Sequence, residues 1–239
     1  MLNLIGLEFQ KIRRTTIYST VIFLSALPVF MIVLQYIVSK DSKKEFYTTV
    51  ANSNIIITMC LYTVFIILTN YVISREHRDS TLIYLFITPQ NRKKILAAKF
   101  GLLFLLLFGL GALTYGSILI VNLILGGVDG EILKRMTEAW LASVILSFFL
   151  MPFIAMIALW RKNFISSMLI ALVLVIFTLP FMFKENAYIV PHLLPMAVSN
   201  NVLRIQNKLE FNYPCAFLLL AVICVICSLI SMKLFNRKE

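Results

Sequence analysis

Six long apolar runs follow one another along the chain, and none of them contains an acidic or basic side chain. They have 19 to 26 residues each and occupy positions 17–38, 55–73, 100–125, 139–160, 164–183 and 213–232. An α-helix rises about 1.5 Å per residue and the hydrocarbon core of a bilayer is about 30 Å thick, so each run is long enough to cross a membrane once. The pattern therefore predicts an all-α integral membrane protein with six transmembrane helices, in a single domain over residues 1–239.

The residues before the first run have the pattern of an amphipathic helix. Apolar positions recur there at helical spacing: Leu2, Ile5, Phe9 and Ile12. Polar positions fall on other faces: Glu8, Lys11 and Arg14. Residues 1–16 therefore predict an elbow helix that lies in the inner membrane interface before the chain turns into the first span.

The polar stretch between the second and third runs, residues 74–99, predicts another helix outside the membrane. Its centre, 81–87, is apolar enough to form a short helix, and Pro89 ends it because the residue before a proline avoids the helical region. One face carries apolar side chains at i, i+3 and i+4: Leu82, Leu85 and Phe86. A basic group then opens the third span: Arg92, Lys93 and Lys94. An apolar face outside lipid predicts contact with a partner protein or with the membrane surface.

Three other segments predict how the helices pack. Only residues 161–163 separate the fourth and fifth runs, so those helices form a tight hairpin. The segment 184–212 is half apolar and predicts short interfacial or re-entrant helices, because an ordinary solvated loop is more polar. In the third run, Ala112-x-x-x-Gly116 predicts a place where a second backbone approaches closely.

Polar and aromatic side chains in the second run lie on one helical face. They follow at spacings of four, four, three and four: Asn54, Thr58, Tyr62, Phe65 and Thr69. Together with Phe177 and Phe181 of the fifth run, they predict the lining of a passage that suits an amphipathic or lipid-like cargo. Hydrogen bonding between helices is an equally simple interpretation of the hydroxyl and amide groups.

Composition and charge agree with a membrane location. Hydrophobic residues make up 60% of the chain and charged ones 14%, against about 25% in a soluble domain. The net charge of +11 is unevenly spread. With the N-terminus inside, the inner segments hold 14 basic and 4 acidic residues, and the outer ones hold 8 and 7. This asymmetry predicts two cytoplasmic termini and contact with anionic lipid. Because topology and lipid contact explain the positive charge, nucleic-acid binding is not predicted.

The sequence shows no catalytic set. It has no G-x-x-x-x-G-K-[ST] motif for ATP, no H-E-x-x-H motif, and no acidic pair at membrane depth. Charged groups at the bilayer centre cost about 2.5–3.5 kcal/mol and mark function where they occur, which weakens an ion-coupled carrier. The Cys224-x-x-Cys227 pair lacks further ligands, so we interpret it as packing rather than a metal site. Energy for transport would have to come from another subunit.

Residues 76–99 carry a recognisable series: Glu76, Ser80-Thr81-Leu82, Leu85, Thr88-Pro89, Arg92, Ile95 and Lys99. This series resembles the segment after the second span of ABC-2 type permeases, which commonly has a Glu, then Gly-Thr-Leu, then a Pro and an Arg. Ser80 stands here in place of the usual Gly. Residues 7–15 also resemble the opening elbow of that family, and the six-span layout agrees with it.

The resemblance implies the membrane subunit of an ABC exporter in a bacterial plasma membrane. Two such chains, identical or paralogous, would pair with two separate ATPase subunits that bind ATP and Mg²⁺, and this chain would bind no cofactor itself. The elbow and residues 75–88 would lie on the ATPases. The implied coupling residues are Glu8, Lys11, Arg14, Arg75, Glu76, Thr81, Leu82, Leu85, Phe86, Pro89 and Arg92. The small size is similar to permeases for lantibiotic immunity, bacitracin resistance and amphipathic-peptide export.

Other interpretations remain beside this one. A self-contained channel or secondary carrier would need no ATPase, and a non-transporting immunity or scaffold protein would only sequester its ligand. An enzyme is the weakest alternative. Glu76 either forms a solvated ion pair with Arg75 and Arg78 or contacts the ATPase.

Overall fold

A computed structural model describes most of the chain. The described residues are 2–13, 15–38, 46–78, 92–125, 130–161, 163–178, 180, 190–203 and 213–236. Within these residues every regular element is a helix. In chain order they are α1 (Leu2–Arg13), α2 (Thr16–Val38), α3 (Phe46–Arg78), α5 (Arg92–Leu125), α6 (Gly130–Arg161), α7 (Phe164–Thr178), a 3₁₀ turn η3 (Pro191–Leu193), α8 (Leu194–Leu203) and α9 (Tyr213–Asn236).

Five of these helices are long and apolar enough to cross a membrane, which confirms a multi-pass membrane protein. They are α2, α3, α5, α6 and α9. The fifth predicted run is shorter in the structure, because α7 has 15 described residues, or about 22 Å, and residues 179 and 181–183 lie outside the described part. A sixth crossing therefore stays a prediction.

Several helices are longer than the apolar runs that predicted them. Helix α3 has 33 residues and α5 has 34, so each is about 50 Å long and exceeds the bilayer core. Helix α6 begins at Gly130, nine residues before the apolar run, and its polar first turns carry a Glu131–Arg135 pair at i, i+4. The end of a charge-free run marks where a helix leaves the lipid, and the helix itself continues.

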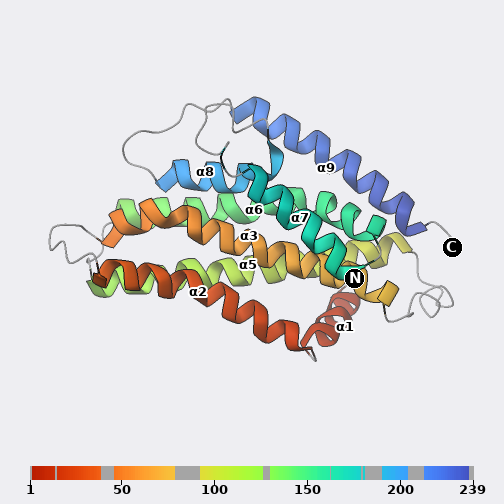
Figure 1. Cartoon of the computed structure of the whole chain (residues 1–239), viewed down its shortest axis with the longest axis horizontal. Coiled ribbons are helices and arrows are strands. Elements are labelled where there is room, and N and C mark those ends of the chain that lie inside the picture. Colours follow the sequence, from red (N-terminus) through yellow and green to blue (C-terminus); the bar gives the residue numbers. More distant parts are fainter. Residues whose placement is uncertain are drawn as a thin grey trace.

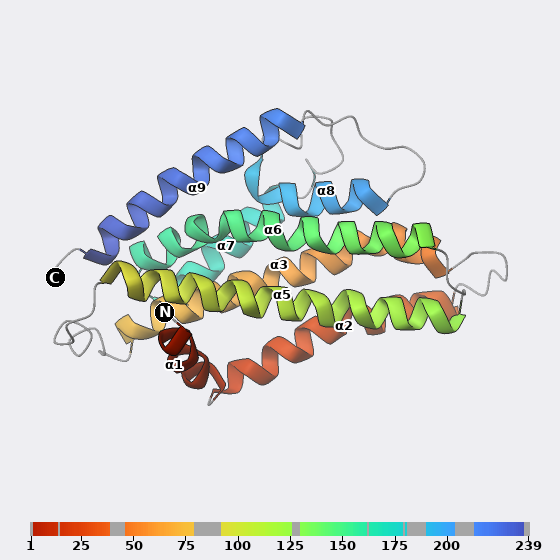
Figure 2. The same ribbon diagram turned by 180° about the vertical axis from the view of Figure 1, so that it is seen from behind.

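Helices α3 and α6 form the centre of the bundle, while α2 and α9 lie on its outside (Figure 1). The apolar window of α3 is 67% buried and that of α6 is 61% buried, against 22% for both α2 and α9. Outer faces keep large apolar side chains exposed, for example Phe23, Phe30 and Leu218. Such faces suit lipid rather than water. Helix α1 and the end of α9 lie at the same end of the bundle (Figures 1 and 2), which we name the α1 end.

The predicted hairpin and the predicted short helices are both present. Helices α6 and α7 pack together, and Asn163 between them accepts a hydrogen bond through Oδ1 from the Ile165 N–H, 3.1 Å away, which caps α7. Helix α8 packs against α3 and α6, and nearly all its side chains are buried. At 10 residues, or about 15 Å, α8 is too short to span a bilayer.

The close approach on α5 occurs one residue before the predicted motif. A Cβ at Gly111 would lie 2.7 Å from Trp140 Nε1 and 3.0 Å from Val144 Cγ2, both on α6. At Gly116 nothing lies within 4 Å of such an atom. Within the described chain, the α5–α6 contact therefore requires glycine at position 111 and leaves position 116 open.

Replacing Gly111 with alanine should destabilise the bundle by about 1–3 kcal/mol, because the new methyl group overlaps the indole ring and Val144 at once. Thermal unfolding in detergent, followed by tryptophan fluorescence, measures the change. Gly116→Ala is the matched control and should leave the transition where it is. Equal transitions for the two variants would contradict the α5–α6 packing.

Candidate functional site

Helix α1 lies across α5 near the α1 end of the bundle (Figures 1 and 2). The chain turns after Ile12, whose carbonyl accepts hydrogen bonds from the Thr15 N–H (2.9 Å) and the Thr15 hydroxyl (2.6 Å). Ile5 on α1 packs onto Gly101 of α5, with its Cδ1 3.3 Å from the place of a Cβ there. A larger residue at 101 would hold α1 further from α5.

A buried ion pair joins α1 to α5. Lys99 Nζ lies 3.1 Å from Glu8 Oε2, and the exposed fractions of the two side chains are 2% and 12%. The same ammonium donates to the Val72 carbonyl of α3, 3.2 Å away. Lys99 therefore ties three helices together: α1, α3 and α5.

The charges around Glu8 keep it ionised. Burial alone would raise the pKa of the Glu8 carboxyl, but the Lys99 charge and the hydrogen bond and charge of Lys11 lower this pKa below its ordinary value. Lys11 Nζ lies 2.6 Å from Glu8 Oε1 and is half exposed. A folded-state pKa below the unfolded one means that the pair stabilises the protein at neutral pH and loses this effect only in acid.

The end of α3 also contacts α1. Arg75 Nη1 donates to the Lys11 carbonyl, 2.9 Å away, and its guanidinium lies 5.8 Å from the centre of the Tyr71 ring. The structure thus brings three predicted coupling residues together: Glu8, Lys11 and Arg75. It shows them bound to one another and to Lys99, so a partner would meet an assembled cluster rather than separate side chains.

The structure does not describe the side chains of the other predicted coupling residues. Arg14, Thr81, Leu82, Leu85, Phe86 and Pro89 lie outside the described residues, as does most of the predicted helix over 75–88. Glu76 and Arg92 lie within α3 and α5, but their side chains are outside the described part. One correction is clear: residues 75–78 continue α3 and do not begin a new helix. The coupling role of all these residues stays a prediction.

The predicted path residues divide between the core and the surface. Thr58, Tyr62, Phe65 and Thr69 of α3 are all buried, at 3% exposure or less. The Thr58 hydroxyl donates to the Asn54 carbonyl of its own helix, 2.9 Å away. Phe177 on α7 is 75% exposed and does not join them, and Phe181 lies outside the described residues. A lining role for the four buried residues stays a prediction.

A buried polar cluster links three helices near the other end of the bundle. The Tyr115 hydroxyl of α5 donates to Asn54 Oδ1 of α3 at 3.0 Å and lies 3.2 Å from the Ser199 hydroxyl of α8. Asn54 Nδ2 donates to the same Ser199 oxygen at 3.3 Å. Two turns earlier on α3, the Tyr47 hydroxyl donates a hydrogen bond to the Leu203 carbonyl of α8 at 2.7 Å. These bonds hold α8 against α3 and α5.

The sequence pattern did not predict the roles of three residues in these clusters. Lys99 was noted only as part of the family pattern, and no ion pair was predicted for it. It is nevertheless the last charged residue before a 26-residue apolar run, a position where a lysine needs a partner. Tyr115 lies inside an apolar run and Ser199 inside a half-apolar segment. Nothing local distinguishes these two hydroxyl groups from others in the chain.

The fold defines a multi-pass α-helical membrane protein. The profile of the ABC-2 family transporter proteins matches residues 4–178, from α1 through α7. The match covers well over half of the chain, so the chain belongs to the ABC-2 family and is a transmembrane permease. Members of this family are generally the non-catalytic membrane component and normally work with an ABC ATPase. No curated protein matches the chain significantly.

Proposed function

We propose that this chain is the permease subunit of an ATP-driven exporter, with six spans and both termini in the cytoplasm. Two copies of the chain, or one copy and a paralogue, pair with two copies of a separate ATPase that carries ATP and Mg²⁺. The single observation that carries the proposal is the cluster at the α1 end: the Glu8–Lys99 ion pair and the Arg75–Lys11 hydrogen bond fix α1 to α3 and α5.

The cluster offers a physical route for force. The predicted coupling segment joins α3 to α5, and both helices are held to α1 at that end of the bundle. Pressure from an ATPase on the segment or on α1 acts on all three helices together. Since α3 packs against the central helix α6, movement at the α1 end reaches the middle of the bundle.

The cargo that we propose is an amphipathic or antimicrobial peptide, or a lipid-like compound. Support comes from the apolar runs, which contain no charged residue, and from the hydroxyl and aromatic groups of α3. Such groups suit a cargo that is itself partly apolar. Removal of the cargo from the membrane and export from the cytoplasm both fit this chemistry.

Reconstitution tests the proposal. The chain is co-expressed with the ATPase encoded beside it, the complex is purified, and uptake of a labelled amphipathic peptide into inverted vesicles is followed with and without ATP. We expect co-purification and ATP-dependent uptake. Full-rate transport by the chain alone, in vesicles without any nucleotide hydrolase, would contradict the proposal. Movement of small ions without any peptide or lipid would contradict the proposed cargo.

A further inference from the structure

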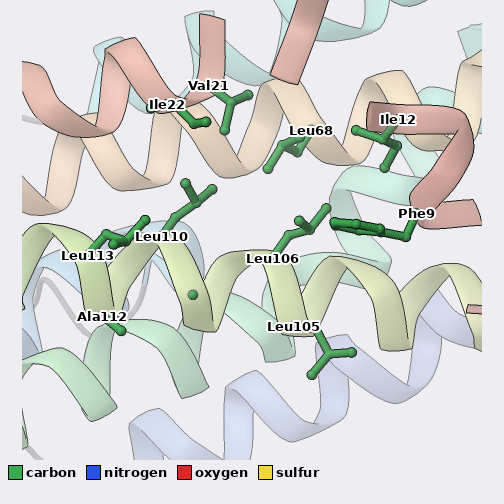
Figure 3. Close-up of a pocket in the computed structure, with 11 residues that line it drawn as sticks. Phe9, Ile12, Val21, Ile22, Leu68, Leu105, Leu106, Leu110, Ala112 and Leu113 are labelled. Carbon is green, nitrogen blue, oxygen red and sulfur yellow. The ribbon is translucent and has the colours of Figure 1, made fainter. Parts of the chain in front are cut away.

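An apolar groove lies between α1, α2 and α5, with Leu68 of α3 at its floor (Figure 3). Its volume is about 470 Å³, within the range of small-molecule sites. Side chains from three helices face the space: Phe9 and Ile12 of α1, Val21 and Ile22 of α2, and Leu106 and Leu110 of α5. All eleven lining residues are apolar, so water in the groove would find no side-chain hydrogen-bond partner.

Two local features open the groove. The turn at Thr15 directs α1 away from the axis of α2, so the two helices diverge (Figure 2). On α5, Gly109 presents no side chain, and nothing lies within 4 Å of the place where its Cβ would be. A leucine at position 109 would therefore project into the space.

The groove has the depth of one leaflet. Lys99, which pairs with Glu8, marks the level of α1 along α5. The lining residues of α5 run from Leu105 to Leu113, about 9 to 21 Å further along the helix. Half of a hydrocarbon core of about 30 Å is about 15 Å, so the groove begins at the level of α1, where Phe9 and Ile12 line it, and reaches a little past the bilayer centre. This is the region that lipid acyl chains occupy.

Basic side chains lie on α1, α3 and α5 at the α1 end of the bundle. Lys11 is half exposed, Lys94 is exposed and Arg75 is partly exposed. The carboxylate described among them is Glu8, and Lys99 and Lys11 already neutralise it. The described charges at this end are therefore predominantly cationic, which complements an anionic headgroup and not a zwitterionic one.

We propose that the groove is a binding site for one acyl chain of an anionic phospholipid from the leaflet on the α1 side, with the phosphate beside the basic end of α1. The inference is separate from the proposed transport function, because it requires only that the chain spans a bilayer. The bound chain fills the space under α1 and supports this helix against α5 through contacts that the polypeptide leaves open.

Photolabelling of the purified full-length chain tests the site. The chain is placed in vesicles of equal parts phosphatidylglycerol and phosphatidylcholine, with a diazirine on the acyl chain of one lipid at a time, and labelled peptides are mapped by mass spectrometry. We expect α2 around Val21 and α5 around Leu106 to be labelled about fivefold more by the phosphatidylglycerol probe, since one basic residue near a headgroup is worth about 1 kcal/mol. Exposed Leu218 on α9 reports ordinary surrounding lipid.

Four variants make the test specific. Gly109→Leu fills the groove and should reduce its labelling about fivefold, with Ala112→Leu as a second filling variant if the first does not fold. Gly116→Leu is the matched control, because it lies two turns further on the same face, has equally open surroundings and does not line the groove. Lys11→Gln should remove the preference for phosphatidylglycerol and keep the labelling by both probes.

Each opposing outcome is distinct. Groove labelling equal to that of α9 and unchanged in both filling variants would mean ordinary surrounding lipid. Equal labelling by the two probes in the unaltered chain would remove the anionic headgroup from the proposal. A cross-link between two copies of the chain at Val21 or Leu106, with lipid labelling absent, would make the groove a protein interface. Any of these results overturns the proposal.

Discussion

Replacing Glu8 with leucine is expected to release α1 from the bundle. The variant leaves the Lys99 ammonium, 2% exposed, without its carboxylate. Breaking a buried pair from one side costs about 3–5 kcal/mol, and we expect about 3 because Lys99 keeps the Val72 carbonyl. A loss of about 3 kcal/mol raises the equilibrium constant for opening of α1 about a hundredfold. Hydrogen exchange of the α1 amides should therefore be about a hundredfold faster.

A second substitution distinguishes charge from packing. Adding Lys99→Met to Glu8→Leu removes the unpaired charge and supplies an apolar side chain of similar length, so most of the lost protection should return. Glu131→Gln is the control, since it breaks an exposed ion pair of α6 with a 2.6 Å distance and should change nothing measurable. If the double variant exchanged faster than the single one, charge pairing would not be what holds α1.

Replacing Tyr115 with phenylalanine is expected to loosen α8. The change keeps the ring and removes the hydroxyl that bonds Asn54 and lies beside Ser199, which leaves two buried polar groups with fewer partners. Unpaired buried groups cost about 1–3 kcal/mol, and measured values between membrane helices lie nearer the lower end. We expect about 1.5 kcal/mol, seen as roughly tenfold faster exchange of the α8 amides.

Tyr62→Phe is the matched control for this change. Tyr62 is buried on α3 at 3% exposure, like Tyr115, but its hydroxyl makes no hydrogen bond among the described residues. Its removal should leave α8 unaffected. If α8 exchange rose equally in both variants, the loss of any buried tyrosine hydroxyl would explain the effect and the cluster would have no special role.

The sequence predicted the helices better than their ends. Apolar runs located α2, α3, α5, α6 and α9, because the absence of charge over about 20 residues is a direct consequence of lipid burial. Hydropathy reports where lipid ends, so it missed the polar continuation of α3 to Arg78 and the start of α6 at Gly130. It predicted short helices within residues 184–212 but not that one of them, α8, would be buried against α3 and α6.

The candidate site was predictable only in part. Helical spacing and the family pattern selected Glu8, Lys11 and Arg75, and the structure places them together. The pattern assigned them to a partner, whereas the structure shows Glu8 engaged with Lys99. The aromatic and hydroxyl face of α3 was predicted as a unit and is buried as one, while Phe177 is separate from it on the surface of α7.

The sequence alone determined that this chain is a multi-pass helical membrane protein, because charge-free runs of span length have one stable solution in lipid. Tertiary structure decided which polar groups become partners. Glu8 and Lys99 are 91 residues apart, and Tyr115 and Asn54 are 61 apart. Which of many serine, tyrosine and lysine side chains are buried, and against what, depends on how the helices cross, and no local pattern of residues encodes that.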